Sequence, residues 1–350
     1  MKKHSRRSLA CALLIICVSL AEPASAEQQG KSSPQYQFLD IEYNDHGLID
    51  KFRNEYMTGF GLKKLQGILE QAAPYRPYIR RRLKEEGMPI CLEFLPIIES
   101  NFNINATSKS GAAGLWQFME NSIAGYLIKD EWIDERKDPW LSTEAAIAKL
   151  KDNYNYFNDW ALALAAYNMG LGGLSSVIKK TGTASAWELI DGGHLKTETT
   201  NYVPKFIAIA DLITNAEYYG IELPEYDESK ELKFSTIKLT TQIGLEQLSH
   251  LASIDIKELE RLNPALIYPV TPYGRNFILR IPQGKEEDVA NAISRMSSLQ
   301  TEIYIVKQGD TLWGISRRYG LTVKELCETN NISETDILRI GTKLFVPIYK

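Results

Sequence analysis

Glu99 stands at the end of an apolar run, within the stretch "CLEFLPIIES". Leu92, Leu95 and Ile98 recur at three-residue intervals, which predicts a helix with one apolar face and Glu99 at its end. A carboxyl group in apolar surroundings resists ionisation, so its pKa rises and it keeps a proton near neutral pH. Such a group can act as the general acid in cleavage of a glycosidic bond. A glutamate at a helix end is more often an ordinary solvated group, so neighbouring residues have to decide.

The segment after Glu99, "TSKSGAAGLWQFM", is rich in small and polar residues. Gly111 and Gly114 allow the backbone to approach a ligand closely. Hydroxyl and amide side chains that can contact a sugar, including its N-acetyl group, are Ser108, Ser110 and Gln117. This composition favours a sugar-binding loop next to the candidate acid.

Two later stretches carry further polar side chains. "ALAAYNMGLGG" presents Tyr167 and Asn168 before a glycine-rich helix end, and "TTNYVPKF" presents Tyr202. Asn168 can cap a helix, brace the helix of Glu99 or contact a substrate, and these alternatives stay open. Ser100, beside Glu99, is expected to make a hydrogen bond within the protein rather than to touch substrate.

Four motifs occur in a fixed order: "ES" at 99–100, "SKSGAAGLWQFM" at 108–119, "AAYNMGLG" at 165–172 and "YVPK" at 202–205. Together they resemble the lysozyme-like catalytic domain of the soluble-type lytic transglycosylases. The resemblance covers residues 93–212 and implies that Glu99 is the catalytic acid. It also implies a set of substrate-binding side chains: Ser108, Ser110, Gln117, Tyr167, Asn168 and Tyr202.

A second carboxylate is missing from these motifs, although most glycosidases use two. Acidic residues do cluster in "KDEWIDERKDP", at Asp130, Glu131, Asp134 and Asp138. We expect that cluster to be a polar surface segment with no fixed relation to Glu99.

The family resemblance implies a reaction that needs only one carboxyl group. Glu99 protonates the oxygen between N-acetylmuramic acid and N-acetylglucosamine, and the muramic N-acetyl group can help to stabilise the cationic centre. Glu99 then takes the proton of the C6 hydroxyl of the same sugar, which attacks C1 and closes a 1,6-anhydro ring. We expect no metal or other cofactor, because the histidines are scattered, at His4, His46, His194 and His250.

Helices are predicted to hold these residues, because apolar side chains recur at intervals of three and four from 51 to 220. Gly87, Gly170 and Gly220 suit helix ends. The fold class is therefore multidomain, with an all-α lysozyme-like domain at 51–220 that follows a polar tail at 27–50.

The remainder of the chain contains an internal duplication. "LEQLSHLASIDIKELERLNP" resembles "LWGISRRYGLTVKELCETNN" at an offset of 67 residues, and strand-like runs flank both copies. The pattern predicts two small α+β modules with the order βααβ, at 235–283 and 302–350. A polar linker at 221–234 precedes the first, and a helical connector at 284–301 separates them.

The second copy, with "VKQGDTLWGIS" at its start and "GTKLFVP" at its end, resembles the LysM module. LysM modules bind N-acetylglucosamine-containing polymers, so the resemblance implies glycan binding at Gly309, Asp310 and Thr311. Asp310 or Thr311 can equally cap a helix. The first copy has Ile243 and Gly244 in their place, so we regard it as a degenerate LysM-like module whose sugar binding stays open.

The N-terminal "MKKHSRRSLACALLIICVSLAEPASA" has the basic start, apolar run and small residues of a signal peptide cut after Ala26. A retained membrane anchor is the alternative, but the apolar run is short for a span. We expect no lipid anchor, because bulky Ile16 precedes Cys17 where a lipoprotein signal needs a small residue. These features predict a periplasmic or cell-envelope protein.

Removal of residues 1–26 leaves 36 basic and 43 acidic side chains. This negative balance argues against a nucleic-acid partner, and we expect no nucleotide partner and a monomer. The predicted function is a peptidoglycan lytic transglycosylase that LysM targets to murein glycan strands. The alternatives are a lysozyme-type muramidase, which is a hydrolase, and a non-catalytic peptidoglycan-binding protein.

Overall fold

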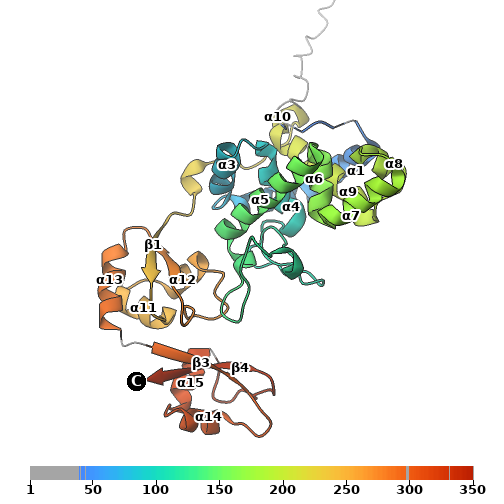
Figure 1. Ribbon diagram of the computed structural model, residues 1–350. Helices are drawn as coiled ribbons and strands as arrows, with labels where there is room; N and C mark the ends of the chain where they lie inside the picture. The colour runs from blue at the N-terminus through green and yellow to red at the C-terminus, as the bar shows by residue number, and fades with distance from the viewer. Residues whose placement is uncertain (1–38, 40, 44, 297–298, 331, 350) are drawn as a thin grey trace, which may run out of the picture. The chain divides into compact units, whose positions relative to one another are not determined.

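The computed structural model describes residues 39, 41–43, 45–296, 299–330 and 332–349, with backbone alone at 299–301 and 349. The predicted signal peptide and most of the predicted tail lie outside the described residues, so cleavage near Ala26 stays a prediction. Figure 1 shows a helical domain and two small modules that each contain helices and strands.

Helices dominate the chain between residues 47 and 219. The α-helices are α1 (Gly47–Tyr56), α2 (Gly59–Ala72), α3 (Arg76–Glu85), α4 (Leu95–Ser100), α5 (Pro139–Phe157), α6 (Trp160–Met169), α7 (Leu171–Thr181), α8 (Ala186–Asp191), α9 (Thr197–Thr214) and α10 (Ala216–Tyr219). Short 3-10 helices are η2 (Ile90–Phe94), η3 (Glu120–Ser122) and η4 (Glu135–Lys137), with η5 (Glu228–Lys230) after α10. The predicted all-α class of this region is confirmed.

The ends of α5 and α6 follow from local sequence. Asp138 accepts hydrogen bonds from the backbone N–H groups of Trp140 and Leu141, at 3.1 and 2.9 Å, and so caps α5. Asn158 ends that helix in the left-handed conformation, and Asp159 caps α6 directly afterwards. Two long helices therefore meet at a tight corner.

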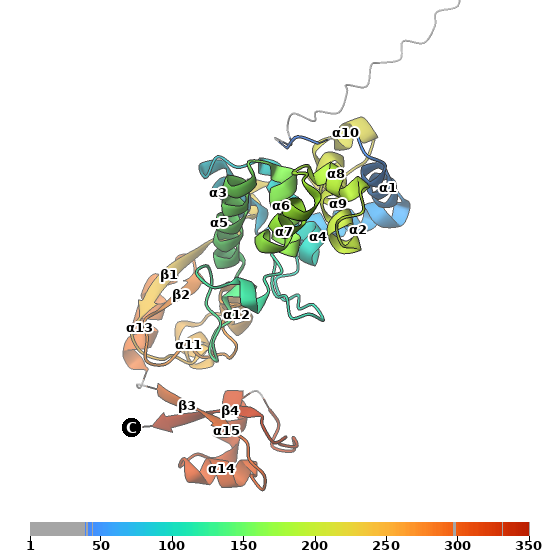
Figure 2. The same cartoon turned by 45° about the vertical axis from the view of Figure 1, so that its right-hand side comes forward.

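α9 is the central helix of the domain, because it packs against α1, α4 and α6 (Figures 1 and 2). Most of its residues between Tyr202 and Leu212 are buried. Burial of such a helix on several sides is the main source of its stability. α9 thus provides a fixed base for the residues that it shares with neighbouring helices.

Each small module contains one two-stranded antiparallel sheet and two helices. The first module holds β1 (Phe234–Leu239), α11 (Leu245–Ala252), α12 (Ile256–Leu262) and β2 (Phe277–Pro282). The second holds β3 (Leu299–Ile305), α14 (Leu312–Arg318), α15 (Val323–Asn330) and β4 (Lys343–Tyr349). The predicted βααβ order is present in both copies.

The duplicated asparagines, Asn263 and Asn330, bridge helix and strand in the same way. Asn263 donates to the carbonyl groups of Leu259 and Arg280 and accepts from the N–H group of Arg280, at 2.7–2.9 Å. Asn330 makes the same set of bonds with Leu326 and Phe345. One side chain therefore joins the second helix of each module to its last strand.

The helix predicted as a connector over 284–301 is α13 (Glu286–Arg295). Its apolar side chains Val289 and Ala292 are fully buried in the core of the first module. The amphipathic pattern of α13 explains this placement, since an apolar stripe on a helix is stabilised by packing. The helix therefore packs on the first module instead of standing alone.

Within the part of the chain that the structure describes, no single helix has the length and apolar character to cross a membrane. α6 and α7 reach that length and apolar character only when taken together, and a bend of 118° separates them. Ala161 to Tyr167, which form most of α6, are buried in the helical domain.

Candidate active site

A cleft of about 880 Å³ opens in the helical domain. Its walls come from α1, α4, α5, α6, α9 and the loop between α4 and α5. The residues that the sequence predicted for catalysis and substrate binding all line it: Glu99, Ser108, Ser110, Gln117, Tyr167, Asn168 and Tyr202. Segments from 99 to 202 in the sequence thus converge on one cavity.

α4 is a short helix that places Glu99 in its last turn. Asn101 and Phe102 follow in the left-handed conformation, with φ of 52° and 58°, and end the helix there. Left-handed residues other than glycine are uncommon and need support from their surroundings. Phe102 is fully buried, and Ser100 donates a hydrogen bond to the carbonyl of Leu115 at 2.8 Å. Ser100 therefore binds within the protein, as expected.

Glu99 carries a proton at neutral pH much more readily than an ordinary glutamate. Burial raises the pKa of its carboxyl to about 7, from an ordinary value of about 4.5. The hydrogen bond from Tyr202 and the charge of Lys149 lower this pKa, whereas the charge of Glu198 raises it. The carboxyl group can therefore both give and accept a proton near pH 7.

Tyr202 lies on α9 and donates a hydrogen bond from its phenol to Oε1 of Glu99. The tyrosine is itself buried, and burial raises its pKa well above the usual value, with the charge of Glu99 adding to the rise. Tyr202 therefore stays protonated and serves as a donor to the carboxyl group.

The loop after α4 folds back on itself by short bridges between Thr107, Ala113 and Phe118. The hydroxyl oxygen of Ser108 accepts a hydrogen bond from the N–H group of Ala112 at 3.0 Å, and Ser108 is exposed and lines the cleft. Gln117 has a φ of 49° and donates to the carbonyl of Gly114 at 2.9 Å. A strained residue that is fixed by hydrogen bonds at a cavity wall is typical of ligand-binding loops.

Arg136 holds this loop in place from one side. Its guanidinium donates to the carbonyl groups of Gly111 and Phe118, at 2.9 and 3.1 Å, and forms a paired contact with Asp134. At Gly114, a Cβ atom would lie 1.6 Å from the carbonyl oxygen of Arg136. Glycine is therefore required where the two backbones cross.

The expectation that "KDEWIDERKDP" is a polar surface segment is wrong for two of its acids. Asp134 and Asp138 are 5% and 1% exposed. Asp134 is buried because it pairs with Arg136, and Asp138 is buried where it caps α5. The segment therefore supports the loop of the cleft from below its surface.

Tyr167 and Asn168 form another wall of the cleft at the end of α6. Tyr167 donates to the carbonyl of Trp116 at 2.9 Å and packs edge-to-face on Phe118. Asn168 accepts from the hydroxyl of Thr199 at 2.7 Å, so it joins α6 to α9. Of the roles open for Asn168, this contact supports bracing, although of α9 and not of the Glu99 helix.

Lys149 and Glu198 also line the cleft, and the sequence reasoning missed both. Glu198 lies one helical turn before Tyr202, so the position of Tyr202 in the motif was a signal that could have found it. Lys149 occupies a helix position that resembles many solvated lysines and gave no signal. The described residues hold no group of three or more His, Cys, Asp or Glu placed to bind a metal.

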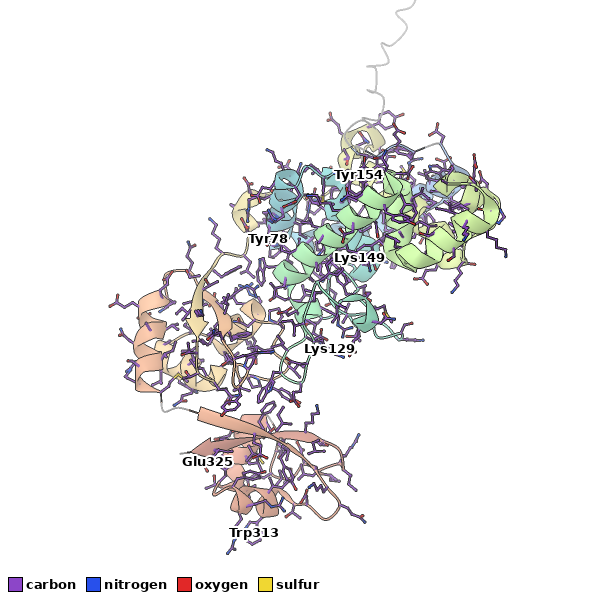
Figure 3. The ribbon with its side chains drawn as sticks, in the orientation of Figure 1. Tyr78, Lys129, Lys149, Tyr154, Trp313 and Glu325 are labelled. Carbon is purple, nitrogen blue, oxygen red and sulfur yellow. The ribbon has the colours of Figure 1, made fainter. Side chains whose placement is uncertain are left out.

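In the second small module, the predicted glycan-binding residues Gly309, Asp310 and Thr311 lie at the start of α14. Thr311 caps that helix by accepting from the N–H group of Gly314 at 3.0 Å. Asp310 accepts from the hydroxyl of Tyr304 at 2.7 Å and from a backbone N–H group. Two of the three therefore have structural bonds, and glycan binding there stays a prediction. Trp313, labelled in Figure 3, is 62% exposed beside them.

Three protein-family models match separate parts of the chain. Residues 77–190 match the transglycosylase SLT domain. The chain carries an SLT domain. Residues 233–298 match the LysM-like domain of lytic transglycosylase MltD, and 304–347 match the LysM domain. The SLT match includes Glu99 and the predicted residues up to Asn168, and Tyr202 lies after its end. The SLT and LysM assignments predicted from the motifs are confirmed.

The alignment with one similar protein covers more of the chain than the SLT match does, and another similar protein matches only a short segment. Membrane-bound lytic murein transglycosylase D of Escherichia coli (strain K12) is 31% identical over 287 residues, which are 77% of this chain and 62% of that protein. N-acetylmuramoyl-L-alanine amidase XlyA of Bacillus subtilis is 48% identical over 46 residues, or 13% and 16% of the two chains. This chain thus spans about three fifths of the length of the Escherichia coli relative.

A solved structure of lytic transglycosylase Slt from Pseudomonas aeruginosa, an inactive mutant, is also similar in part. It has 24% sequence identity, with 41% of this chain and 24% of the other covered, and a TM-score of 0.34.

Proposed function

We propose that this protein is a peptidoglycan lytic transglycosylase that cleaves the β-1,4 bond between N-acetylmuramic acid and N-acetylglucosamine without water. The observation that carries the proposal is the carboxyl group of Glu99, whose pKa burial raises to about 7, in a cleft that the SLT motifs line. A half-protonated acid at neutral pH suits a reaction in which one group first gives and then accepts a proton.

In the proposed mechanism, Glu99 donates its proton to the bridging oxygen as the bond to C1 breaks. The positive charge that develops at C1 is shared with the substrate's N-acetyl group. The carboxylate of Glu99 then takes the proton of the C6 hydroxyl, whose oxygen forms a new bond to C1. Tyr202 donates to Glu99 throughout and so holds the carboxyl in one orientation.

The proposed substrate-binding residues are those on the loop and on α6. Ser108, Ser110 and Gln117 stand on the loop that Arg136 fixes, which supports a role in contacting the sugars. The N-acetyl groups of the substrate offer carbonyl and N–H partners to such hydroxyl and amide side chains. We propose that Tyr167 and Asn168, at the end of α6, form the cleft wall beside this loop.

For the remainder of the chain we propose a division of labour that follows the domains predicted from sequence. The helical domain at 51–220 cleaves the glycan, and the LysM module at 302–350 holds the enzyme on murein. The module at 235–283 has Gly244 without a side-chain cap where the other has Thr311, so its glycan binding stays open. A substrate of this kind implies a cell-envelope location, and we propose a monomer exported by the predicted signal peptide without a lipid anchor.

The direct test is product analysis of purified sacculi digested with the wild type and with Glu99→Gln. We expect anhydromuropeptides from the wild type and a loss of cleavage of about 100-fold or more in the variant. If all products had reducing ends, the enzyme would be a hydrolase and the proposed transglycosylase activity would be wrong. If Glu99→Gln cleaved sacculi as fast as the wild type, Glu99 would not be the catalytic acid.

One observation favours hydrolysis as the second candidate, namely that Glu198 also lines the cleft. A hydrolase uses a second carboxylate as base or nucleophile, and Glu198 is the other carboxylate among the lining residues. Its exposed side chain and its contact with the amide of Asn168 at 3.4 Å instead suit a role at the rim. Glu198→Gln separates the two: we expect cleavage to continue, whereas a hydrolase would lose it.

A further inference from the structure

Lys149 is a partly buried cation beside the proposed catalytic acid. It projects from α5 (Figure 3) and lines the same cleft as Glu99. Its ammonium lies over two aromatic rings, 4.9 Å from the centroid of Tyr167 and 5.3 Å from that of Phe118. Among the residues that the structure describes, it forms no ion pair and no hydrogen bond.

A lysine in this position costs stability. Taking an ammonium group out of water is unfavourable unless a partner compensates, and burial lowers the pKa of Lys149, with the charge of Glu99 acting against that change. Contacts with two aromatic faces offset part of this cost. A methionine would occupy the same space without the penalty, so packing alone does not explain a lysine here.

The two rings hold the ammonium without neutralising it. A carboxylate partner would cancel most of the field of Lys149, whereas an aromatic face leaves the full charge to act on its neighbours. Glu99 is surrounded by Tyr202 and Glu198 from α9, Tyr167 from α6 and Lys149 from α5. Lys149 supplies the positive charge in this set.

We propose that Lys149 is a positioning residue for the reaction, acting through its fixed charge on the carboxyl group of Glu99. The inference rests on the proposed function, in which Glu99 is neutral before bond cleavage and negative afterwards. When the proton passes to the leaving oxygen, the carboxylate forms next to the ammonium and is stabilised. The C6 hydroxyl then returns a proton to Glu99, and Lys149 neither gives nor takes one.

The test compares Lys149→Met, Lys149→Gln and Lys149→Arg with the full-length wild type. The readout is the pH dependence of kcat/KM for release of anhydromuropeptides between pH 5 and 9. Without the positive charge, Glu99 keeps its proton to higher pH, so the fall in activity on the basic side moves up by about 0.5 pH unit or more in Met and Gln. We also expect kcat at the optimum to fall about tenfold, and Arg to restore both.

Lys151→Met is the matched control, because Lys151 lies on the same helix and its ammonium pairs with Glu86 at 2.8 Å. That variant should keep the wild-type pH profile. Thermal unfolding should show Lys149→Met at least as stable as the wild type, which separates lost charge from lost structure.

Two results would overturn the role of Lys149. The first is that kcat/KM of Lys149→Met and Lys149→Gln falls at the same basic pH as that of the wild type. The second is that Lys151→Met shifts this pH as much as the Lys149 variants do. Wild-type digests without anhydro products would overturn the proposed function instead, and the shift can still be read from any cleavage product. The two failures are therefore distinct.

Discussion

The phenol of Tyr202 donates a hydrogen bond to Oε1 of Glu99 although 103 positions separate the two in sequence. Burial raises the pKa of Glu99, and the Tyr202 bond lowers it. The first effect is the larger, which leaves the carboxyl group with a pKa of about 7. The proton equilibrium of the proposed acid thus depends on how α4 packs on α9.

Tyr202→Phe should raise the pKa of Glu99, because the ring stays while the hydrogen bond to the carboxylate is lost. We expect the basic side of the activity profile to move to higher pH and cleavage at pH 7 to fall about tenfold. A steady-state assay on murein between pH 5 and 9 measures both. An unchanged profile would show that the bond does not control the proton of Glu99.

Glu99 should also make the stability of the fold depend on pH. Its pKa is higher in the folded than in the unfolded chain, so the folded state binds the proton more tightly. The free energy of unfolding should therefore fall as pH rises from about 4.5 to 7, by up to about 3 kcal/mol, and then level off. Urea titrations at pH 5 and pH 8 should show a smaller drop for Glu99→Gln than for the wild type. Equal drops would contradict the raised pKa.

Gly114→Ala should disrupt the loop of the cleft more than Gly111→Ala does. Both glycines have positive φ, 80° and 89°, so each alanine variant carries backbone strain of about 1 kcal/mol. Only at Gly114 would the new Cβ meet the carbonyl oxygen of Arg136, whereas nothing lies within 4 Å at Gly111. We expect Gly114→Ala to cost about 3 kcal/mol or more and to abolish cleavage. Similar unfolding midpoints for the two variants would disprove the close approach.

Deletion of 302–350 should weaken attachment to sacculi and leave the cleavage of short soluble glycans intact. The second module has its own hydrophobic core, and none of the residues that the structure describes there lines the cleft. Co-sedimentation with sacculi and product analysis on short glycans measure the two properties separately. Undiminished co-sedimentation would assign the binding to another part of the chain.

Much of the fold could be predicted because its periodic patterns are local. β1 and β2 coincide with the two strand-like runs that flank the first copy of the repeat, "FSTIKL" at 234–239 and "FILRIP" at 277–282. The helical character of α13 was also visible in its sequence. Its burial against the first module was not, since an amphipathic pattern shows that a helix has a partner but not which one.

The cleft residues that belong to sequence motifs were predicted. Those that only tertiary packing brings to the cleft were missed. Glu99 was predicted to lie in the site because its motif and the three that follow it occur in a fixed order in the sequence. Lys149 comes to the cleft by the packing of α5 against α6, which no short pattern records. Asp134 was misplaced for a related reason, because a run of charges looks solvated until its partner Arg136 is known to be buried.

The asparagines Asn263 and Asn330 have a consequence for the history of the two modules. Each closes its module by hydrogen bonds to backbone atoms alone. Backbone atoms are the same whatever side chains surround them, so substitutions elsewhere leave this closure intact. After the duplication, the residues at the start of the first helix were therefore free to diverge, to Gly244 in one copy and Thr311 in the other. The residue that closes each repeat and the residue that begins its first helix therefore stand at different positions.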